Sequence, residues 1–252
     1  MKSYLGPAMT RISLRYNLLL TFIFFSFAFA NTMDNGDQKE VPKNRKGDWE
    51  VLFDGKSVDK WKGKSESGFP KKGWKIENGL LYLAEKGGGD IITKEKYSDF
   101  ELVFQFNFTE AANSGIKYFV DTLVNRESGN TMFNGPEYQI IDDYNNEHLK
   151  DDPNGLSSTA SAYLLYAPKG KKLNPHVQWN TGRIIAKNGR VEHWLNGARV
   201  VKYKRGSKDF LKRKAGTKFR NDKNYGELKS GHILLTDHND TVYFKDIKIR
   251  RL

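Results

Sequence analysis

The sequence predicts an all-β fold, an antiparallel jelly-roll β-sandwich, and three observations support this. From Trp49 onward, apolar residues recur at every second position, which is the period of a β-strand. Asn-Gly pairs interrupt the pattern at residues 78–79, 188–189 and 196–197, and such pairs favour the turns that join antiparallel strands. No segment shows a sustained helical period, so an α/β fold is not expected.

Residues 1–30 predict a secretory signal peptide. Three basic residues and no acid precede or flank an apolar run at 18–30, which ends in Ala28-Phe29-Ala30. The run is shorter than the roughly 20 residues that span a membrane, so cleavage is favoured over a membrane anchor. We expect a polar linker at 31–47, one β-sandwich domain at 48–252, and no membrane association after cleavage.

The cysteine count narrows the possible chemistry. The chain has no cysteine, which excludes a disulfide framework, a thiolate metal site, a catalytic thiol and an acylated lipoprotein cysteine. Together with the signal peptide, this composition predicts secretion across a bacterial inner membrane, to the periplasm or the cell exterior.

Strand patterns run through the rest of the chain. In the segment Phe100 to Phe108 every second residue is apolar, which indicates a half-buried strand with one wet side. The segment 183–203 reads as a three-strand meander with two Asn-Gly turns, a pattern common in jelly-roll sandwiches. We predict strands at residues 74–76, 80–84, 90–93, 100–108, 115–120, 137–141, 162–166, 179–187, 190–195, 200–203, 231–236 and 242–250.

The positive charge is concentrated in one connection between strands. The formal net charge of +12 falls to +9 without residues 1–30, and residues 202–223 hold ten of the remaining Lys and Arg residues. A nucleic-acid binder would combine such a run with a reading helix or stacking aromatics. We interpret this run as a solvated insertion packed by Phe210, Phe219 and Tyr225, and expect no nucleic-acid partner.

Two polar clusters fall on predicted strands. Period-two alternation places Lys117 on one face with Phe119 and Asp121, and it places Glu137 on one face with Gln139 and Ile141. A carboxylate and an amide two residues apart suit sugar hydroxyls, which both donate and accept hydrogen bonds. From spacing alone, the alternative for each cluster is an ordinary exposed strand face without a binding role.

A third cluster, 236–240, follows a strand and contains Asp237-His238. This pair could ligate a metal ion or orient an acid/base imidazole, and a plain turn is the alternative. His176 lies in a predicted loop from which it could reach a site, whereas His193 alternates with core residues and is expected to be packed. No metalloprotease, P-loop, nucleophile-elbow or dinucleotide motif is present.

Eight short segments follow one another along the mature chain: WEVLFDGK at 49–56 with Trp61, GGDIIT at 88–93, FEL at 100–102, NSGI at 113–116, EYQIID at 137–142, WN at 179–180, WLNG at 194–197 and FKDIKI at 244–249. In this order they resemble the 3-keto-disaccharide hydrolase domain family. The resemblance covers about residues 48–252. It implies a concanavalin-A-like jelly roll and a carbohydrate substrate, a 3-keto-glycoside supplied by a separate sugar 3-dehydrogenase.

The implied chemistry needs no pair of carboxylates at glycosidase spacing. A ketone at C3 acidifies the C2 proton, so that a base can remove it, the aglycone at C1 can leave, and water can add back. Such a site needs a base, an acid and a group that polarises the ketone. The resemblance suggests Glu137 and Asp142 as carboxylates, Lys117 for the ketone and His238 as acid/base; Asn113, Gln139, Asn180 and His176 as substrate-binding residues; and Asp237 with His238 as ligands for a divalent metal ion.

The sequence departs from the family pattern beside these segments, at Thr236, Asn239, Val177-Gln178 and Ala160-Ser161. These changes could mark a different sugar or a copy that binds without turnover. The alternative function is therefore a non-catalytic carbohydrate-binding β-sandwich module. A closed pocket joining Glu137, Lys117 and His238 would favour catalysis, and an open groove with aromatics would favour binding alone.

Overall fold

The structure, a computed structural model, describes residues 47–252. The predicted signal peptide and residues 31–46 of the predicted linker lie outside this part. Within it, no helix is long and apolar enough to cross a membrane.

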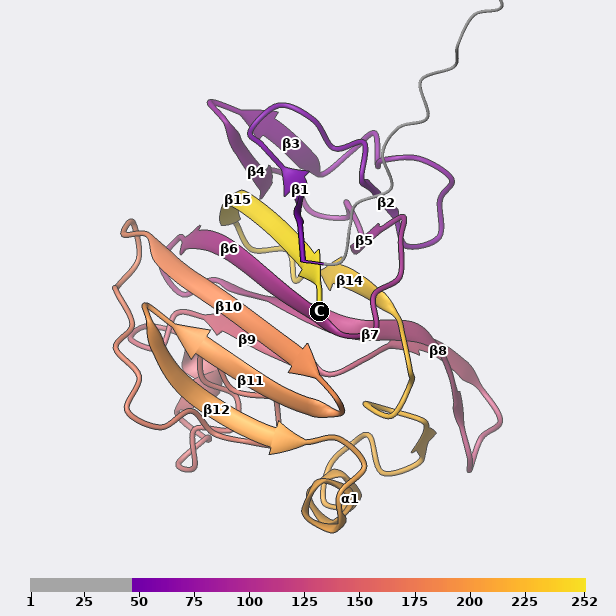
Figure 1. The fold of residues 1–252 in the computed structure, drawn as a ribbon. Coiled ribbons are helices and arrows are strands. Elements are labelled where there is room, and N and C mark those ends of the chain that lie inside the picture. Colours follow the sequence, from indigo (N-terminus) through magenta and orange to yellow (C-terminus); the bar gives the residue numbers. More distant parts are fainter. Residues whose placement is uncertain (1–46) are drawn as a thin grey trace, which may run out of the picture. The chain divides into compact units, whose positions relative to one another are not determined.

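Two antiparallel sheets pack face to face (Figure 1). The eight-stranded sheet has the order β12-β11-β10-β6-β15-β4-β3, and β1 also pairs with β15. Its strands are β1 (Trp49–Phe53), β3 (Trp74–Glu77), β4 (Leu80–Leu83), β6 (Phe100–Phe108), β10 (Asn180–Lys187), β11 (Arg190–Leu195), β12 (Ala198–Lys204) and β15 (Val242–Arg251).

The seven-stranded sheet has the order β13-β7-β14-β5-β2, and β8 and β9 also pair with β7. Its strands are β2 (Trp61–Gly63), β5 (Ile91–Thr93), β7 (Asn113–Asn125), β8 (Thr131–Asn134), β9 (Glu137–Ile141), β13 (Asp222–Lys223) and β14 (His232–Leu235). The predicted all-β fold, an antiparallel β-sandwich, is confirmed.

The core lies between the sheets and is rich in aromatic residues. The five alternating apolar residues of β6, from Phe100 to Phe108, are each no more than 1% exposed, which confirms the predicted strand face. His193 is fully buried as predicted, and its ring joins the hydroxyl of Tyr118 at 2.8 Å and the carbonyl of Ala160 at 3.0 Å. Burial lowers the pKa of His193 to about 4.

Two sequence predictions of local structure are wrong. Residues 162–166 form a turn instead of a strand, because the N–H groups of Leu165 and Tyr166 both donate to the Ala162 carbonyl and Leu164 has φ +62°. The basic insertion contains a helix, α1 (Lys208–Ala215), whose Ser207 side chain accepts the Phe210 N–H as an N-cap. Its single buried apolar residue, Phe210, gives no helical period. A 3₁₀ turn, η1 (Glu147–Leu149), was also not predicted.

A bulge in β7 overturns the predicted face of Phe119. This residue has φ +52° and packs in the core beside Tyr118, so it does not share the face of Lys117. Gly231 makes the bulge possible, since a β-carbon there would lie 2.2 Å from the carbonyl carbon of Phe119. Alternation in β7 therefore holds only up to Tyr118, and this stretch carries Asn113 and Lys117.

Candidate active site

A cavity of about 910 Å³ opens against the outer face of the seven-stranded sheet. Five side chains predicted from the sequence line it together: Asn113, Lys117, Glu137, Gln139 and His238. The strand register explains the grouping. Lys117 pairs with Glu137 across β7 and β9, and Gln139 Nε2 donates to Asn113 Oδ1 at 2.9 Å. The predicted common face of Glu137, Gln139 and Ile141 is confirmed.

Glu137 is the carboxylate at the centre of this group. It is 5% exposed, and its Oε1 has no hydrogen-bond partner among the described residues. Burial raises its pKa above the ordinary glutamate value, while Lys117, His238 and Lys218 act in the opposite direction. A buried carboxylate that is drawn toward neutrality and faces three basic groups is suited to accept a proton from a ligand.

Two ammonium groups face the cavity without a carboxylate partner. Within the described part of the chain, neither Lys117 nor Lys218 has an acidic oxygen within 4.0 Å. Lys218 Nζ instead lies 4.9 Å from the ring centre of Tyr163 and 5.4 Å from that of Phe219. Such cations can stabilise negative charge that develops on a bound ligand.

Lys218, Tyr163 and Phe219 are among the cavity residues that the sequence interpretation missed. The packing of the insertion is as predicted, since Phe219 stacks on Tyr225 with ring centres 4.1 Å apart and Phe210 is fully buried. The insertion is more than a solvated loop, however, because it forms one wall of the cavity. The aromatic residues interleaved with its lysines were the sequence pattern that could have indicated a role in the cavity.

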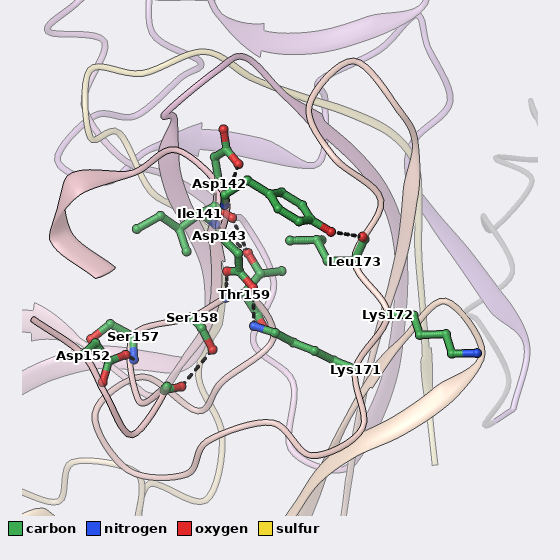
Figure 2. Close-up of polar contacts among 12 residues, drawn as sticks. Ile141, Asp142, Asp143, Asp152, Ser157, Ser158, Thr159, Lys171, Lys172 and Leu173 are labelled. Atoms are coloured by element: carbon green, nitrogen blue, oxygen red, sulfur yellow. Dashed lines mark hydrogen bonds and ion pairs between the residues drawn. The ribbon is translucent and has the colours of Figure 1, made fainter. Parts of the chain in front are cut away.

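The segment after β9 supports the strand that carries Glu137. Thr159 bonds both the N–H and the C=O of Ile141, and the Ala160 N–H donates to Gln139 O at 2.8 Å. Figure 2 shows how this segment is held: Lys171 forms an ion pair with Asp143 and donates to the Thr159 carbonyl at 3.1 Å. These bonds give β9 an ordered outer neighbour in place of a further strand.

The structure places the other predicted site residues outside the cavity. Asp142 is fully buried and accepts hydrogen bonds from Ala111 N and Tyr144 N, and Asn180 bonds Asn174 and Asn196. His176 Nδ1 is 3.9 Å from Asp142 Oδ2. These contacts are typical of residues that hold loops together.

The side chains of Asp237 and His238 have different surroundings. The carboxylate of Asp237 accepts the N–H groups of Gly89 and Asn239 at 2.7 and 2.8 Å, whereas His238 lines the cavity. Between residues 47 and 252, no group of three or more His, Asp or Glu side chains is arranged to hold a metal ion. The pair therefore offers an imidazole to the cavity and a carboxylate to the neighbouring turn.

A family model described as the 3-keto-alpha-glucoside-1,2-lyase-like domain matches residues 48–250. The chain belongs to this family. It is 28% identical over 240 residues to a 3-keto-disaccharide hydrolase of Bacteroides thetaiotaomicron, covering 86% of this chain and 82% of that protein. The resemblance noted in the sequence is thereby confirmed.

Solved structures agree with the family assignment. A Parabacteroides distasonis protein, provisionally described as a glycosyl hydrolase, matches with a TM-score of 0.69 and 30% identity, over 81% of this chain and 94% of that one. A second structure of the same description and organism matches at TM-score 0.58 and 25% identity, over 81% and 100%. The 3-keto-disaccharide hydrolase family consists of carbohydrate-active enzymes, and its sandwich here carries the cavity around Glu137.

Proposed function

We propose that this protein cleaves 3-keto-glycosides by C2 proton abstraction, elimination and rehydration. The observation that carries the proposal is the unpartnered, buried carboxylate oxygen of Glu137, which faces Lys117, Lys218 and His238 in one cavity. The relative from Bacteroides thetaiotaomicron, which bears the name 3-keto-disaccharide hydrolase, supports the same substrate class.

Each group has one task in this scheme. The Glu137 carboxylate takes the proton from C2, and the enolate charge that develops on the C3 oxygen is stabilised by the ammonium groups of Lys117 and Lys218. The C1–O bond then breaks, and His238 protonates the departing oxygen. Water then adds to C1 of the resulting enone, giving one proton to His238, while Glu137 returns its proton to C2; both residues regain their starting states, and the sum is net hydrolysis.

The amide groups account for binding. Asn113 and Gln139 are already bonded to each other, which fixes the orientation of both amides beside Glu137. Their remaining donors and acceptors suit the hydroxyls of the sugar. A cavity that joins Glu137, Lys117 and His238 favours catalysis over a binding module, which would rely on an open face with stacking aromatics.

The substrate and the location belong to the same proposal. A 3-keto-glycoside requires prior oxidation of the C3 hydroxyl, so a separate sugar 3-dehydrogenase supplies it. The predicted signal peptide would deliver the enzyme to the periplasm or the cell exterior.

Incubation with a 3-keto-glucoside carrying a chromogenic aglycone tests the activity, with and without a chelator to report any role of a divalent ion. We expect aglycone release by the wild type and strong losses in Glu137→Gln and His238→Ala. If both variants cleaved at the wild-type rate, the assignment of roles would be wrong. Sugar binding without turnover in the wild type would favour the binding module.

A further inference from the structure

The strands β10, β11 and β12 carry a pronounced excess of positive charge. Residues 180–204 contain six Lys and Arg residues and one acid, Glu192. Alternation turns five of the six basic side chains to the outer face of the eight-stranded sheet, and a register shift in β12 brings the sixth, Arg199, to the same face opposite Trp194. All six are exposed or half-buried. These are the three neighbouring orange strands in Figure 1.

Three of the cations stand directly opposite one another. Lys187 pairs with Arg190 across β10 and β11, and Arg190 pairs with Lys204 across β11 and β12. We call these three residues the basic row. Like charges directly opposite in a sheet repel, so a row of three is unfavourable in the free protein.

The acids nearby do not neutralise the basic row. Glu192 is bound by Arg199 at 3.1 Å and Lys202 at 3.8 Å. Asp99, at the adjoining turn, accepts the backbone N–H of Asn188 at 3.2 Å. Among the described residues, no carboxylate lies within 4.0 Å of a charged nitrogen of the row.

The surface is hollowed at the basic row. A depression of about 520 Å³ is lined by all three cations with Ile185, Asn188 and Glu192. A second depression of about 390 Å³ adjoins it at Arg190 and Lys204. The cations thus border a place where a ligand can lie against the sheet.

We propose that the basic row binds a carboxylated polysaccharide, a polyuronate chain that crosses the three strands. Neighbouring strands lie about 4.8 Å apart, so the row presents one cation per strand at that repeat. A polyuronate carries one carboxylate on each sugar ring, and its charges therefore repeat on the same scale. Arg190 can bind a carboxylate through two parallel hydrogen bonds, which adds geometric selectivity.

The aromatic content of the surface distinguishes this occupant from a nucleic acid, since both are polyanions. The row itself lies on strands, and the one aromatic residue among the described residues that line its two depressions, Tyr203, is buried with only 5% of its surface exposed. Binding of single strands relies on exposed aromatic rings on which bases stack. The basic row therefore fits carboxylates better than bases.

This surface does not depend on the proposed cleavage reaction. The basic row lies on the eight-stranded sheet, whereas the cavity around Glu137 lies against the seven-stranded sheet. A protein held on an acidic polysaccharide through the row would keep its cavity free for substrate.

Affinity electrophoresis and titration calorimetry with polygalacturonate test the proposal, with fully methyl-esterified polygalacturonate as the uncharged ligand. We expect the wild type to bind the acidic form, to bind it less tightly as salt rises, and not to bind the ester. The triple variant Lys187→Gln, Arg190→Gln, Lys204→Gln should bind at least tenfold more weakly. Its thermal stability should be unchanged or higher, since the repulsion is removed.

The matched control is Lys71→Gln, Lys72→Gln, Lys86→Gln, which removes three exposed charges outside the row. It should bind within about twofold of the wild type. The proposal is overturned if the wild type does not bind polygalacturonate, if it binds the ester equally well, if it binds single-stranded DNA more tightly, or if both triple variants lose the same affinity. Aglycone release by the row variant should match the wild type.

Discussion

The carboxylate of Glu137 occupies the space that a β-carbon on Gly115 would fill. A β-carbon built at Gly115 lies 2.1 Å from Glu137 Oε1 and 2.9 Å from its Cδ. The two residues lie on paired strands, β7 and β9, and Gly115 is opposite Gln139. A glycine at this position therefore lets the acidic side chain lie flat against the strand, under Lys117.

Gly115→Ala should abolish most activity and keep the fold. The clash is with the end of a flexible side chain, which can rotate away, but the carboxylate then leaves its place. Misplacing a reacting group by about 1 Å can cost roughly 10²-fold in rate. We expect a loss of at least that size in kcat/KM with a melting temperature near that of the wild type.

Gly182→Ala is the matched control for this prediction. A β-carbon at Gly182 would lie 2.2 Å from the ring of Phe104, which is packed in the core and cannot rotate away. This variant should lose about 1–3 kcal/mol of stability. A Gly115→Ala enzyme with full activity would contradict the placement of Glu137.

Glu137→Gln should lower the rate of cleavage and raise stability together. Loss of a general base costs about 10²- to 10⁴-fold. Burial raises the pKa of Glu137 in the folded state, so the ionised carboxylate is less favourable in the folded protein than in the unfolded chain. The stability that the protonated Glu137 contributes is fully present below the unfolded-state pKa and is lost as pH rises through the raised folded-state pKa. The neutral glutamine should thus increase the free energy of unfolding at pH 7, measured by denaturant titration.

Asp142→Asn provides the contrast. Burial opposes its charge, but hydrogen bonds from Asn145, Ala111 and Tyr144 outweigh burial and lower the pKa of Asp142. The amide would set an N–H donor against these donors, so stability should fall by about 1–3 kcal/mol. A Glu137→Gln protein less stable than the wild type at pH 7 would count against the assigned pKa direction.

The pH dependence of cleavage should show the effect of Lys117 on Glu137. The base must be ionised, so kcat/KM should fall on the acid side at a pH above the ordinary glutamate pKa. Lys117 counteracts the effect of burial on that pKa. Lys117→Gln should therefore move the acid limb to higher pH and reduce the plateau rate by about 10²-fold. Lys71→Gln should leave the profile unchanged.

The stability of the sandwich should fall between about pH 6.5 and pH 4 because of His193. Burial lowers its pKa to about 4 from 6.5, so the unfolded chain takes up the proton first as the pH falls. The contribution of the neutral His193 to the free energy of unfolding, about 3 kcal/mol, is fully present above pH 6.5 and is lost as the pH falls to the folded-state pKa. Thermal unfolding of His193→Gln should show a smaller pH slope; an equal slope would contradict the burial of an uncharged imidazole.

Much of the fold could be predicted from the sequence, because alternation within a strand and Asn-Gly turns are local patterns. Alternation in 100–108 and the Asn-Gly turns predicted β6 and the β10–β12 meander closely. The strands β1, β2, β8 and β13, of two to five residues, were not predicted, although other strands as short as these were. The face of Phe119 was predicted wrongly because the bulge at this residue depends on Gly231, which is distant in the chain.

The site was predictable where it lies on paired strands. Spacing indicated the common face of Glu137 and Gln139 and the face of Lys117, and the family resemblance joined these residues with Asn113; the pairing of β7 with β9 is what brings them together. Lys218 and Tyr163 come from a connection and a turn, whose positions follow from tertiary packing. Asp142, Asn180 and Asp237 look functional in sequence because they are polar beside strands, yet their groups bond the backbone or side chains of neighbouring loops.

The most direct test of C2 proton abstraction in the cavity is single-turnover cleavage of a 3-keto-glucoside carrying deuterium at C2. If the Glu137 carboxylate removes that proton in the slow step, the deuterated substrate should release its aglycone severalfold more slowly than the protiated one. Equal rates, with Glu137→Gln as active as the wild type, would contradict elimination through Glu137.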